Sequence, residues 1–475
     1  MRRTDDTIAV PPSNTPPTSA TACEAKGKEE AKRCQFWLPN KRRFCASIPL
    51  RSSRFCGNHD PTAEARRMPC PIDPSHFVSV ENLKSHVRIC PFKKQAVALE
   101  SQPYYSKGIN TGSSDNTEDD VVDSSVKRNA VLGMSVQDFC NLLAKIKSMH
   151  SAISVLFPES YIIPDACNKW LKQQLDRKLP YQEKHALQQA SIIGNIEAFG
   201  ILRKPKKEWT RPFCHEFVGR DDFDGDESQV RAVVEFGAGR GYLTHMLMDC
   251  YGITNAFLVE RRSYKLKADR SLRKNRGIIL ERLRIDIADL NLYEVKLLKG
   301  LDYLAIGKHL CGPATDLTIS CCLNGYKQNE ETHLQGLALA TCCHHLCQWK
   351  YYTNTKFLLS LGITKEEFHA MTWFSSWAVD ADHTSELSDM PYQSTSLSSI
   401  DKELNFEGSD VNDVIQRMPA LDRALMGFMC KEIIDVGRLL LLRDHGIEAQ
   451  LVKYVPPNIS PENNLLVAKC CHVQK

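Results

Sequence analysis

The stretch Ala232-Val-Val-Glu-Phe-Gly-Ala-Gly-Arg-Gly-Tyr-Leu243 decides the fold class of this chain. Its apolar residues Val233, Val234 and Phe236 are typical of a buried parallel strand. The residues from Leu243 to Tyr251 (LTHMLMDCY) then have the composition of a helix. Three glycines lie at alternate positions between the two segments: Gly237, Gly239 and Gly241. The stretch therefore predicts a strand, a glycine-rich turn and a helix, the unit from which open α/β sheets are built.

The glycine-rich turn is expected to hold a ligand. Glycines allow the backbone to approach a bound molecule closely, and the amino end of the helix offers free N–H groups. A dinucleotide fingerprint would need its third glycine at Tyr242, which argues against NAD. The E-x-G-x-G-x-G pattern instead resembles the first motif of Rossmann-like S-adenosylmethionine (SAM) methyltransferases. That resemblance implies that Glu235 faces the amino group of the methionine moiety; a glycine turn without a ligand is the alternative.

Two acidic residues follow at the ends of the next predicted strands. The strand over 255–260 ends in Glu260, about twenty residues beyond the glycines, where an acid can accept hydrogen bonds from ribose hydroxyls. This role fits SAM and NAD equally. The strand over 277–286 ends in Asp286, a candidate partner for the adenine amino group.

The predicted fourth and fifth strands also end in reactive side chains. A strand over 301–306 is followed by a turn that contains Lys308 and His309. Ligands of open α/β sheets bind outside the carboxyl ends of the strands, so this turn is expected beside the reacting group. The strand over 337–341 leads into Cys-Cys-His-His at 342–345, which we interpret as a rim of the active site. A packed strand end and a metal site are the alternatives, although strand alternation makes one four-ligand cluster awkward.

The remaining pattern completes a Rossmann-like, seven-stranded α/β domain. Lys184, Gln188 and Gln189 either line the mouth of the site or form a solvated helix face. Further helices are expected over 136–149, 164–177, 181–199 and 417–445, and two last strands over 447–455 and 465–471.

Composition narrows the class of protein. The chain has 475 residues, of which 42% are hydrophobic, which is enough for two or three domains. It has no apolar run long enough to span a membrane and no apolar signal segment. Its 19 cysteines then favour metal binding or burial in a reducing, intracellular compartment, either the cytoplasm or the nucleus. No motif points to an obligate protein partner.

Two sets of cysteines and histidines precede the α/β region. Four soft ligands close a tetrahedral structural zinc site, and about sixty residues with so little core need such a metal to fold. Scattered core cysteines beside exposed histidines are the alternative. The sets are Cys34, Cys45, Cys56 and His59, and Cys70, His76, His86 and Cys90.

The expected domain organisation follows from these sets. Residues 1–30 are predicted to be disordered, residues 31–61 and 67–94 to be two zinc fingers, and residues 100–130 to be a linker. Residues 131–475 form the helical lead-in and the SAM-dependent domain. Between Lys32 and Lys94 the chain has 13 basic and 4 acidic residues, a local balance of +9 that favours nucleic acid.

The two sets of cysteines and histidines resemble the CCCH and CHHC zinc fingers of the eukaryotic tRNA 2′-O-ribose methyltransferases that modify the fourth nucleotide of the acceptor stem. The resemblance continues through the segment after Lys184, the glycine turn, and the segments around Lys308 and His344. It implies a SAM-dependent tRNA methyltransferase with two structural zinc ions. Lys308 and His309 are the candidate catalytic residues, because a group must remove or screen the hydroxyl proton. A non-catalytic RNA-binding protein and a methyltransferase acting on protein are the alternatives.

Overall fold

The structure is a computed structural model of the chain. The chain divides into two compact units, Met1–Ala98 and Leu99–Lys475. Residues 1–30, for which disorder is predicted, lie outside the described part. The structure describes residues 33–38, 43–45, 48–49, 53–56, 67–72, 76–112, 121–153, 155–176, 183–204, 230–262, 277–324, 326, 333–379 and 409–470.

The first unit has short elements and little apolar core. Two small antiparallel sheets form, and the buried residues of each cluster are mainly its cysteines. Such a small core is a reason for these segments to need a metal. The elements are β1 (Trp37–Leu38), β2 (Arg43–Phe44), β3 (Arg67–Pro69), β4 (Phe77–Ser79), η3 (Val80–Asn82) and α1 (Leu83–Ile89), and α2 (Lys93–Glu100) follows.

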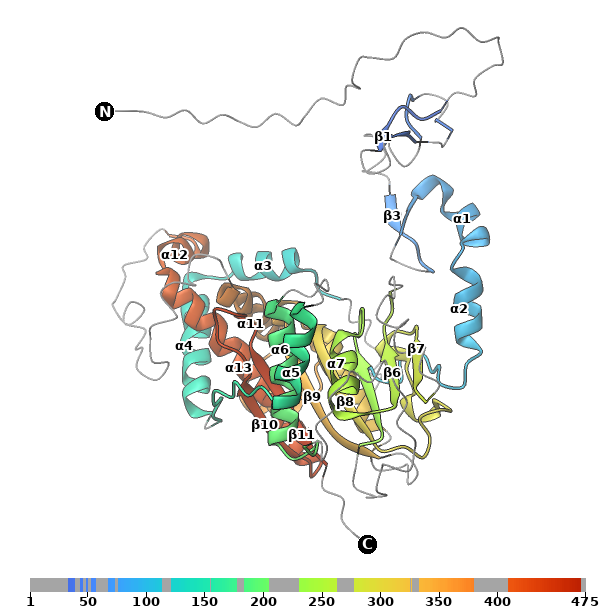
Figure 1. The fold of residues 1–475 in the computed structure, drawn as a ribbon. Helices are drawn as coiled ribbons and strands as arrows, with labels where there is room; N and C mark the ends of the chain where they lie inside the picture. The colour runs from blue at the N-terminus through green and yellow to red at the C-terminus, as the bar shows by residue number, and fades with distance from the viewer. Residues whose placement is uncertain are drawn as a thin grey trace, which may run out of the picture. The chain divides into compact units, whose positions relative to one another are not determined.

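The second unit is built on a seven-stranded mixed sheet, which confirms the predicted α/β class (Figure 1). The strand order is β10-β11-β9-β8-β5-β6-β7. The five strands from β9 to β7 are parallel, and β11 runs antiparallel to both of its neighbours. The strands are β5 (Ala232–Phe236), β6 (Asn255–Val259), β7 (Ile279–Leu283), β8 (Tyr303–Cys311), β9 (Leu334–Cys342), β10 (Glu448–Lys453) and β11 (Asn464–Lys469).

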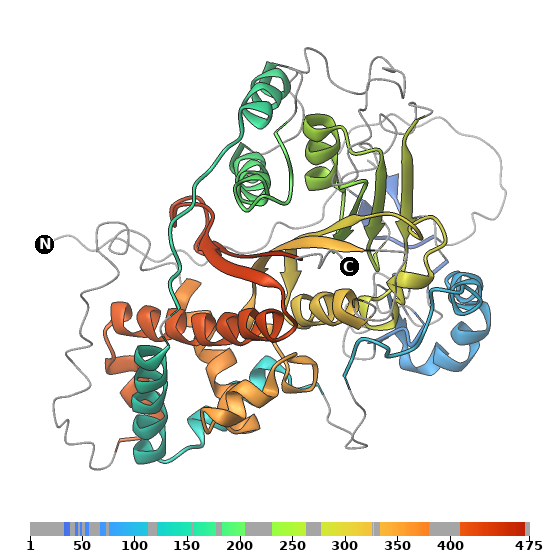
Figure 2. The same cartoon turned by 90° about the horizontal axis from the view of Figure 1, so that it is seen from below.

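Helices cover both faces of this sheet, so the residues of β5 are all buried, as predicted for a parallel strand (Figure 2). One face packs against α5 (Asp165–Asp176), α6 (Glu183–Ala198) and α7 (Tyr242–Tyr251). The other packs against α9 (Pro313–Asn324) and α13 (Ala420–Asp444). None of the helices that the structure describes is long and apolar enough to cross a membrane.

A second helical layer packs on α13 and has an apolar core of its own. The predicted helix over 136–149 is confirmed as α4, and the hydroxyl of Ser135 accepts from the backbone N–H of Asp138 at its start. The layer contains α3 (Ser124–Leu132), α4 (Val136–Ala152), α10 (Thr355–Ser360), α11 (Lys365–Phe374) and α12 (Val411–Arg417).

Two sequence expectations differ from the structure. The linker predicted over 100–130 is packed at both ends: Asn110 is buried and donates to the backbone oxygens of Ile287 and Leu290, and Ser124–Leu132 forms α3. These contacts are tertiary, so the polar composition of the segment does not reveal them.

The second is the start of the helix predicted over 417–445. The helix is confirmed as α13, but it begins at Ala420 because Met418 and Pro419 separate it from α12 and Pro419 is its N-cap. Proline suits a helix start because it has no N–H to donate.

Candidate active site and metal clusters

A cavity of about 810 Å³ lies at the carboxyl ends of β5, β6 and β8. The chain runs from β5 outward to β6 and β7 and then returns to β8 on the other side of β5. A reversal of this kind is where open α/β sheets bind their ligands. The cavity brings together all eight residues predicted for cofactor binding and catalysis: Glu235, Gly237, Gly239, Gly241, Glu260, Asp286, Lys308 and His309.

The glycine turn has a backbone that only glycine adopts easily. The φ angles of Gly237, Gly239 and Gly241 are 61°, 51° and 75°. A Cβ on Gly237 would lie 3.1 Å from Leu310, and one on Gly241 would lie 3.1 Å from Leu258. Gly241 is the N-cap of α7, so the turn presents the amino end of that helix to the cavity.

Glu235 is a buried carboxylic acid at the start of this turn. Its Oε2 accepts from the backbone N–H of Thr244 at 3.1 Å and from the hydroxyl of Thr244 at 2.5 Å. Burial raises the pKa of Glu235 to about 7, although the hydrogen bonds from Thr244 and the positive charges of Arg282 and Lys308 act to lower it. The side chain therefore titrates near neutral pH.

The two downstream acids lie on the rim of the cavity. Glu260 Oε2 accepts from the backbone N–H of Gly239 at 3.1 Å, which joins the end of β6 to the glycine turn. Asp286 caps the short helix η5 (Ile287–Asp289) and forms an ion pair with Arg261 at 3.2 Å. Both carboxylates thus have protein partners and still line the cavity.

Lys308 and His309 form a hydrogen-bonded pair, and their position corrects one expectation. They do not lie in a turn, because β8 continues through them to Cys311, with a register shift between Gly307 and Leu310. His309 has a φ of 68°, rare for a residue other than glycine. Lys308 Nζ lies 3.0 Å from His309 Nε2 and 3.4 Å from His185 Nδ1.

The surroundings favour the neutral forms of both side chains. Burial lowers the pKa of Lys308 to about 8; Cys342 and Glu235 act to raise it, and Lys184 acts to lower it. Burial, with the neighbouring Lys308 and His185, lowers the pKa of His309 to about 4. His309 is therefore neutral at pH 7, and Lys308 has an accessible neutral form.

Two side chains that contact the site were not predicted from the sequence. His185 from α6 reaches Lys308, and Arg282 from β7 donates to the backbone oxygen of Gly239 at 2.8 Å. Gln189 is buried rather than solvated, and its Oε1 has no hydrogen-bond partner among the described residues. The segment after Lys184 thus lines the site, which was one of the two interpretations of its sequence.

A group of three cysteines, which we call the cysteine corner, lies beside this cavity and consists of Cys311, Cys342 and Cys343. The strand alternation assumed from the sequence stops at Cys342, because Cys343 has a φ of 50° and the chain turns into η7 (His344–Leu346). Cys342 and Cys343 therefore both approach Cys311 from β8, and the three sulfur atoms lie within 4.8 Å of one another. Hydrogen bonds to Cys342 and Cys343 lower the pKa of the Cys311 thiol.

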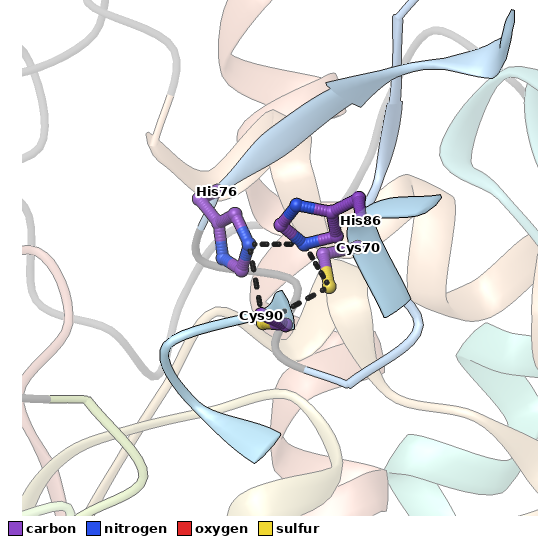
Figure 3. Close-up of side chains that lie close together, drawn as sticks. All are labelled: Cys70, His76, His86 and Cys90. Atoms are coloured by element: carbon purple, nitrogen blue, oxygen red, sulfur yellow. Dashed lines mark hydrogen bonds between the residues drawn. The ribbon is translucent and has the colours of Figure 1, made fainter. Parts of the chain in front are cut away.

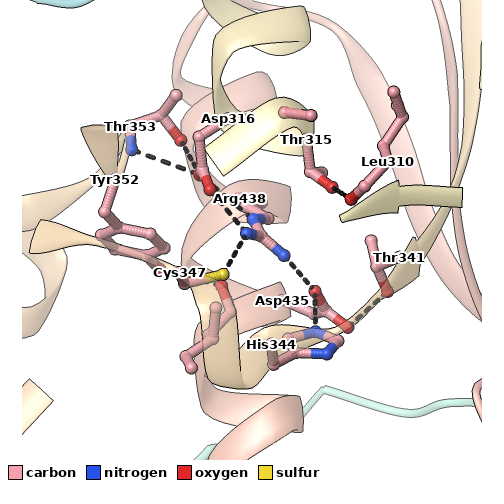
Figure 4. Close-up of polar contacts among 12 residues, drawn as sticks. Leu310, Thr315, Asp316, Thr341, His344, Cys347, Tyr352, Thr353, Asp435 and Arg438 are labelled. Atoms are coloured by element: carbon pink, nitrogen blue, oxygen red, sulfur yellow. Dashed lines mark hydrogen bonds and ion pairs between the residues drawn. The ribbon is translucent and has the colours of Figure 1, made fainter. Parts of the chain in front are cut away.

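His344 instead joins a buried polar network (Figure 4). Its Nε2 lies 2.9 Å from Asp435 Oδ1, and Thr341 donates to Asp435 Oδ2 at 2.8 Å. Arg438 donates to Asp435 at 2.9 Å and makes two hydrogen bonds to Asp316. The network ties the ends of β9 and the start of α9 to α13.

The second cysteine and histidine set converges on one point (Figure 3). Cys70 Sγ lies 3.2 Å from His86 Nε2 and 3.9 Å from Cys90 Sγ. His76 Nε2 lies 3.0 Å from His86 Nε2 and 3.7 Å from Cys90 Sγ. Four nitrogen and sulfur atoms in this arrangement suit the donor set of a structural zinc ion.

The first set is described for its three cysteines, and His59 lies outside the described residues. The sulfur atoms of Cys34, Cys45 and Cys56 gather within 4.8 Å of one another, with Cys45 and Cys56 4.0 Å apart. The backbone N–H of Cys56 donates to Cys34 Sγ at 3.1 Å. Three of the four predicted ligands are thus together.

The fold and the two kinds of site together define a mixed α/β protein with a ligand cavity at its sheet and cysteine and histidine clusters of the zinc finger type. Residues 187–469 match the Methyltransferase TRM13 family, and the chain belongs to this family. Residues 32–60 match the CCCH zinc finger of TRM13 proteins, and residues 67–91 match the U11-48K-like CHHC zinc finger. The family resemblance inferred from the sequence is confirmed.

Curated relatives agree with this family. The chain is 51% identical over 242 residues to the "tRNA:m(4)X modification enzyme TRM13" of Oryza sativa subsp. japonica. This match covers 50% of this chain and 91% of the relative. It is 29% identical over 493 residues to the Mus musculus "tRNA:m(4)X modification enzyme TRM13 homolog", and this match covers 93% of this chain and 95% of the relative. The Homo sapiens homolog is 28% identical over 505 residues, with 95% and 97% covered. No solved structure matches the chain.

Proposed function

We propose that this methyltransferase transfers the methyl group of SAM to a ribose 2′-hydroxyl in the acceptor stem of tRNA. The observation that carries the proposal is the position of Lys308 and His309 in the same cavity as the glycine turn. The relatives are named tRNA modification enzymes, which supports tRNA as the acceptor. The strand order, with a single antiparallel strand between β9 and β10, supports a Rossmann-like assignment.

The cavity fits a nucleoside cofactor that carries an amino acid. Its volume of about 810 Å³ lies within the range usual for small-molecule sites. Acidic side chains stand at the ends of β5, β6 and β7, and the glycine turn leaves room for backbone contact. SAM supplies an electrophilic methyl group on a sulfonium.

Each predicted cofactor residue has a separate task in this proposal. Oε2 of Glu235 is engaged by Thr244, so Oε1 is the atom that accepts from the amino group of the methionine moiety. Glu260 accepts from the ribose hydroxyls, and Asp286 accepts from the adenine amino group. Gly239 leaves open space beside the turn, because a Cβ there would meet no atom closer than 4.0 Å, whereas Gly237 and Gly241 allow the turn to pack against Leu310 and Leu258.

Lys308 and His309 act on the acceptor hydroxyl. A neutral Lys308 can take the hydroxyl proton, and neutral His309 orients the amine through the 3.0 Å contact. A protonated Lys308 would instead stabilise the developing negative charge on the oxygen. In both cases the pair must hold the hydroxyl in line with the methyl group, because positioning carries much of the barrier.

The two fingers bind RNA in this proposal and hold one structural zinc ion each. Their ligands are Cys34, Cys45, Cys56 and His59, and Cys70, His76, His86 and Cys90. The basic composition of the finger segment, with a balance of +9, favours phosphates. Duplex RNA is recognised largely by its shape and its 2′-hydroxyls, so the fingers need no base-specific contact.

Substrates with a single missing oxygen test the proposal. A tRNA with a 2′-deoxy nucleotide at the fourth acceptor-stem position should accept no methyl group from SAM. The matched control carries the deoxy nucleotide at the third position and should be methylated normally. Equal methylation of both substrates would contradict ribose methylation at this position, and methylation of the enzyme preparation's proteins alone would favour a protein acceptor.

A further inference from the structure

The cysteine corner has more ligand atoms than the proposed chemistry uses. Cys311 and Cys342 are directly paired residues of the parallel strands β8 and β9, and their sulfur atoms lie 3.8 Å apart. Cys343 adds a third sulfur within 4.8 Å of both. None of these residues belongs to the sequence segments that match the two zinc fingers.

The sulfur spacing fits a metal ion. Two thiolates at about 2.3 Å from a tetrahedral zinc ion lie about 3.8 Å from each other. The distance between Cys311 and Cys342 agrees with this value, and so do the 3.9 Å and 4.0 Å sulfur distances in the two finger clusters. A dication also removes the repulsion that three neighbouring thiolates would otherwise have.

The backbone of the corner is held in a demanding conformation. Among the described residues, His309 and Cys343 are those with positive φ that are not glycines, and they flank the cluster. A non-glycine residue in this region is strained and persists where its surroundings impose the conformation. Here Asp435 contacts Thr341 and His344 on the two sides of the cysteine pair. Lys127 fixes the following turn by donating to the backbone oxygens of His345 and Cys347.

We propose that Cys311, Cys342 and Cys343 bind a third zinc ion at the edge of the methyl-transfer cavity. The three thiolates fill three coordination positions, and the fourth is left to water or to a ligand from the cavity, which Cys311 lines. A disulfide between Cys311 and Cys342 is the chemical alternative, since paired residues of neighbouring strands are close enough for one. The disulfide would leave Cys343 without a role, whereas a metal ion uses all three sulfur atoms.

Zinc content tests this proposal without SAM or tRNA, so its outcome is independent of the proposed function. The full chain, expressed with zinc and purified under reducing conditions, should contain about three zinc ions per chain by mass spectrometry, two in the fingers and one in the corner. The double variant Cys342→Ser, Cys343→Ser should contain about one fewer. Cys311→Ser alone, at an exposed position, should show the same loss and guards against misfolding of the double variant.

Two control variants show whether a change in zinc content is specific to the cysteine corner. Cys140→Ser removes a partly exposed thiol of α4 outside the cluster and should leave the zinc content unchanged. Cys70→Ser should remove a finger ion and leave the corner ion in place. A wild-type content of about two zinc ions would overturn the proposal, whether the corner thiols are then recovered free or as a disulfide. A content of three that Cys311→Ser does not change would overturn it as well.

Discussion

At the scale of single residues, the site depends on side chains whose protonation is set by burial. Glu235 has a pKa raised to about 7, and Lys308 has a pKa lowered to about 8. Both shifts bring the titration toward neutral pH, as is common in active sites. Each residue therefore gives a prediction that a purely structural role would not.

We expect Lys308→Ala to lower kcat by ~10²–10⁴-fold, the usual contribution of a general acid or base. The affinity for SAM, measured by calorimetry, should change little, since Lys308 acts on the acceptor. For His309 we choose His309→Asn rather than alanine, because asparagine tolerates the positive φ at this position. Near-normal turnover in both variants would rule the pair out as catalytic residues.

The pH dependence of cofactor binding tests Glu235. Its ionised form accepts from the cationic amino group of the ligand, so affinity should fall as the pH drops through about 7. At pH 6 the Kd of S-adenosylhomocysteine should be about tenfold larger than at a pH where Glu235 is fully ionised. Glu235→Gln keeps an oxygen for Thr244 and should flatten this dependence. A wild-type Kd that is constant between pH 6 and pH 7.5 would contradict the assignment.

At the scale of secondary structure elements, the glycine turn and the buried network hold the site in place. The turn from β5 to α7 was predictable, because apolar strand residues, glycines and a helix follow one another directly in the sequence. The course of β8 through Lys308 was not predictable, because its register shift depends on pairing with β9. The same pairing unites Cys311 with Cys342 across 31 positions, which no local pattern reveals.

Two matched glycine substitutions separate strain from ligand binding. Gly239 and Gly446 both have positive φ, and a Cβ on either meets no atom closer than 4.0 Å. Alanine at each position should therefore lower the free energy of unfolding by a similar amount, about 1–2 kcal/mol. Only Gly239→Ala should also weaken SAM binding, since its methyl group enters the cavity. Equal SAM affinity of the two variants in calorimetry would contradict the placement of the cofactor.

The buried network predicts a large loss of stability. Arg438→Met leaves Asp316 and Asp435 without their charge partner and should lower the free energy of unfolding by about 3–5 kcal/mol. Burial acts to raise the pKa of Asp435, but His344 and Arg438 hold it below its usual range. Its stabilisation is thus present above the unfolded pKa and is lost as the pH falls. A loss below about 1 kcal/mol in urea unfolding at pH 7 would show that the network contributes little.

At the scale of the whole molecule, a basic finger unit and a methyltransferase unit share one chain. The spacing of cysteines and histidines in the sequence predicted the fingers, and the acidic residues at the ends of strands predicted part of the cavity lining. The segment after residue 100 was predicted only in part, because the contacts of Asn110 join residues almost 180 positions apart. Local composition carries no record of such contacts.

The division of labour between the units is testable. Cys56→Ala, or removal of zinc from the fingers, should weaken tRNA binding by more than tenfold while the Kd of SAM stays the same within about twofold. Filter binding and calorimetry on the same preparation measure the two affinities. Unchanged affinity for both ligands would contradict an RNA-binding role of the fingers.

The central claim is SAM-dependent ribose methylation of tRNA, and one measurement tests it most directly. The chain is incubated with methyl-labelled SAM and total tRNA, and the RNA is digested to nucleosides for chromatography. The account predicts label in 2′-O-methylated nucleosides from tRNA, and its loss with Lys308→Ala. Label found in methylated bases or in protein alone, or no label at all from a zinc-loaded, SAM-binding preparation, would contradict it.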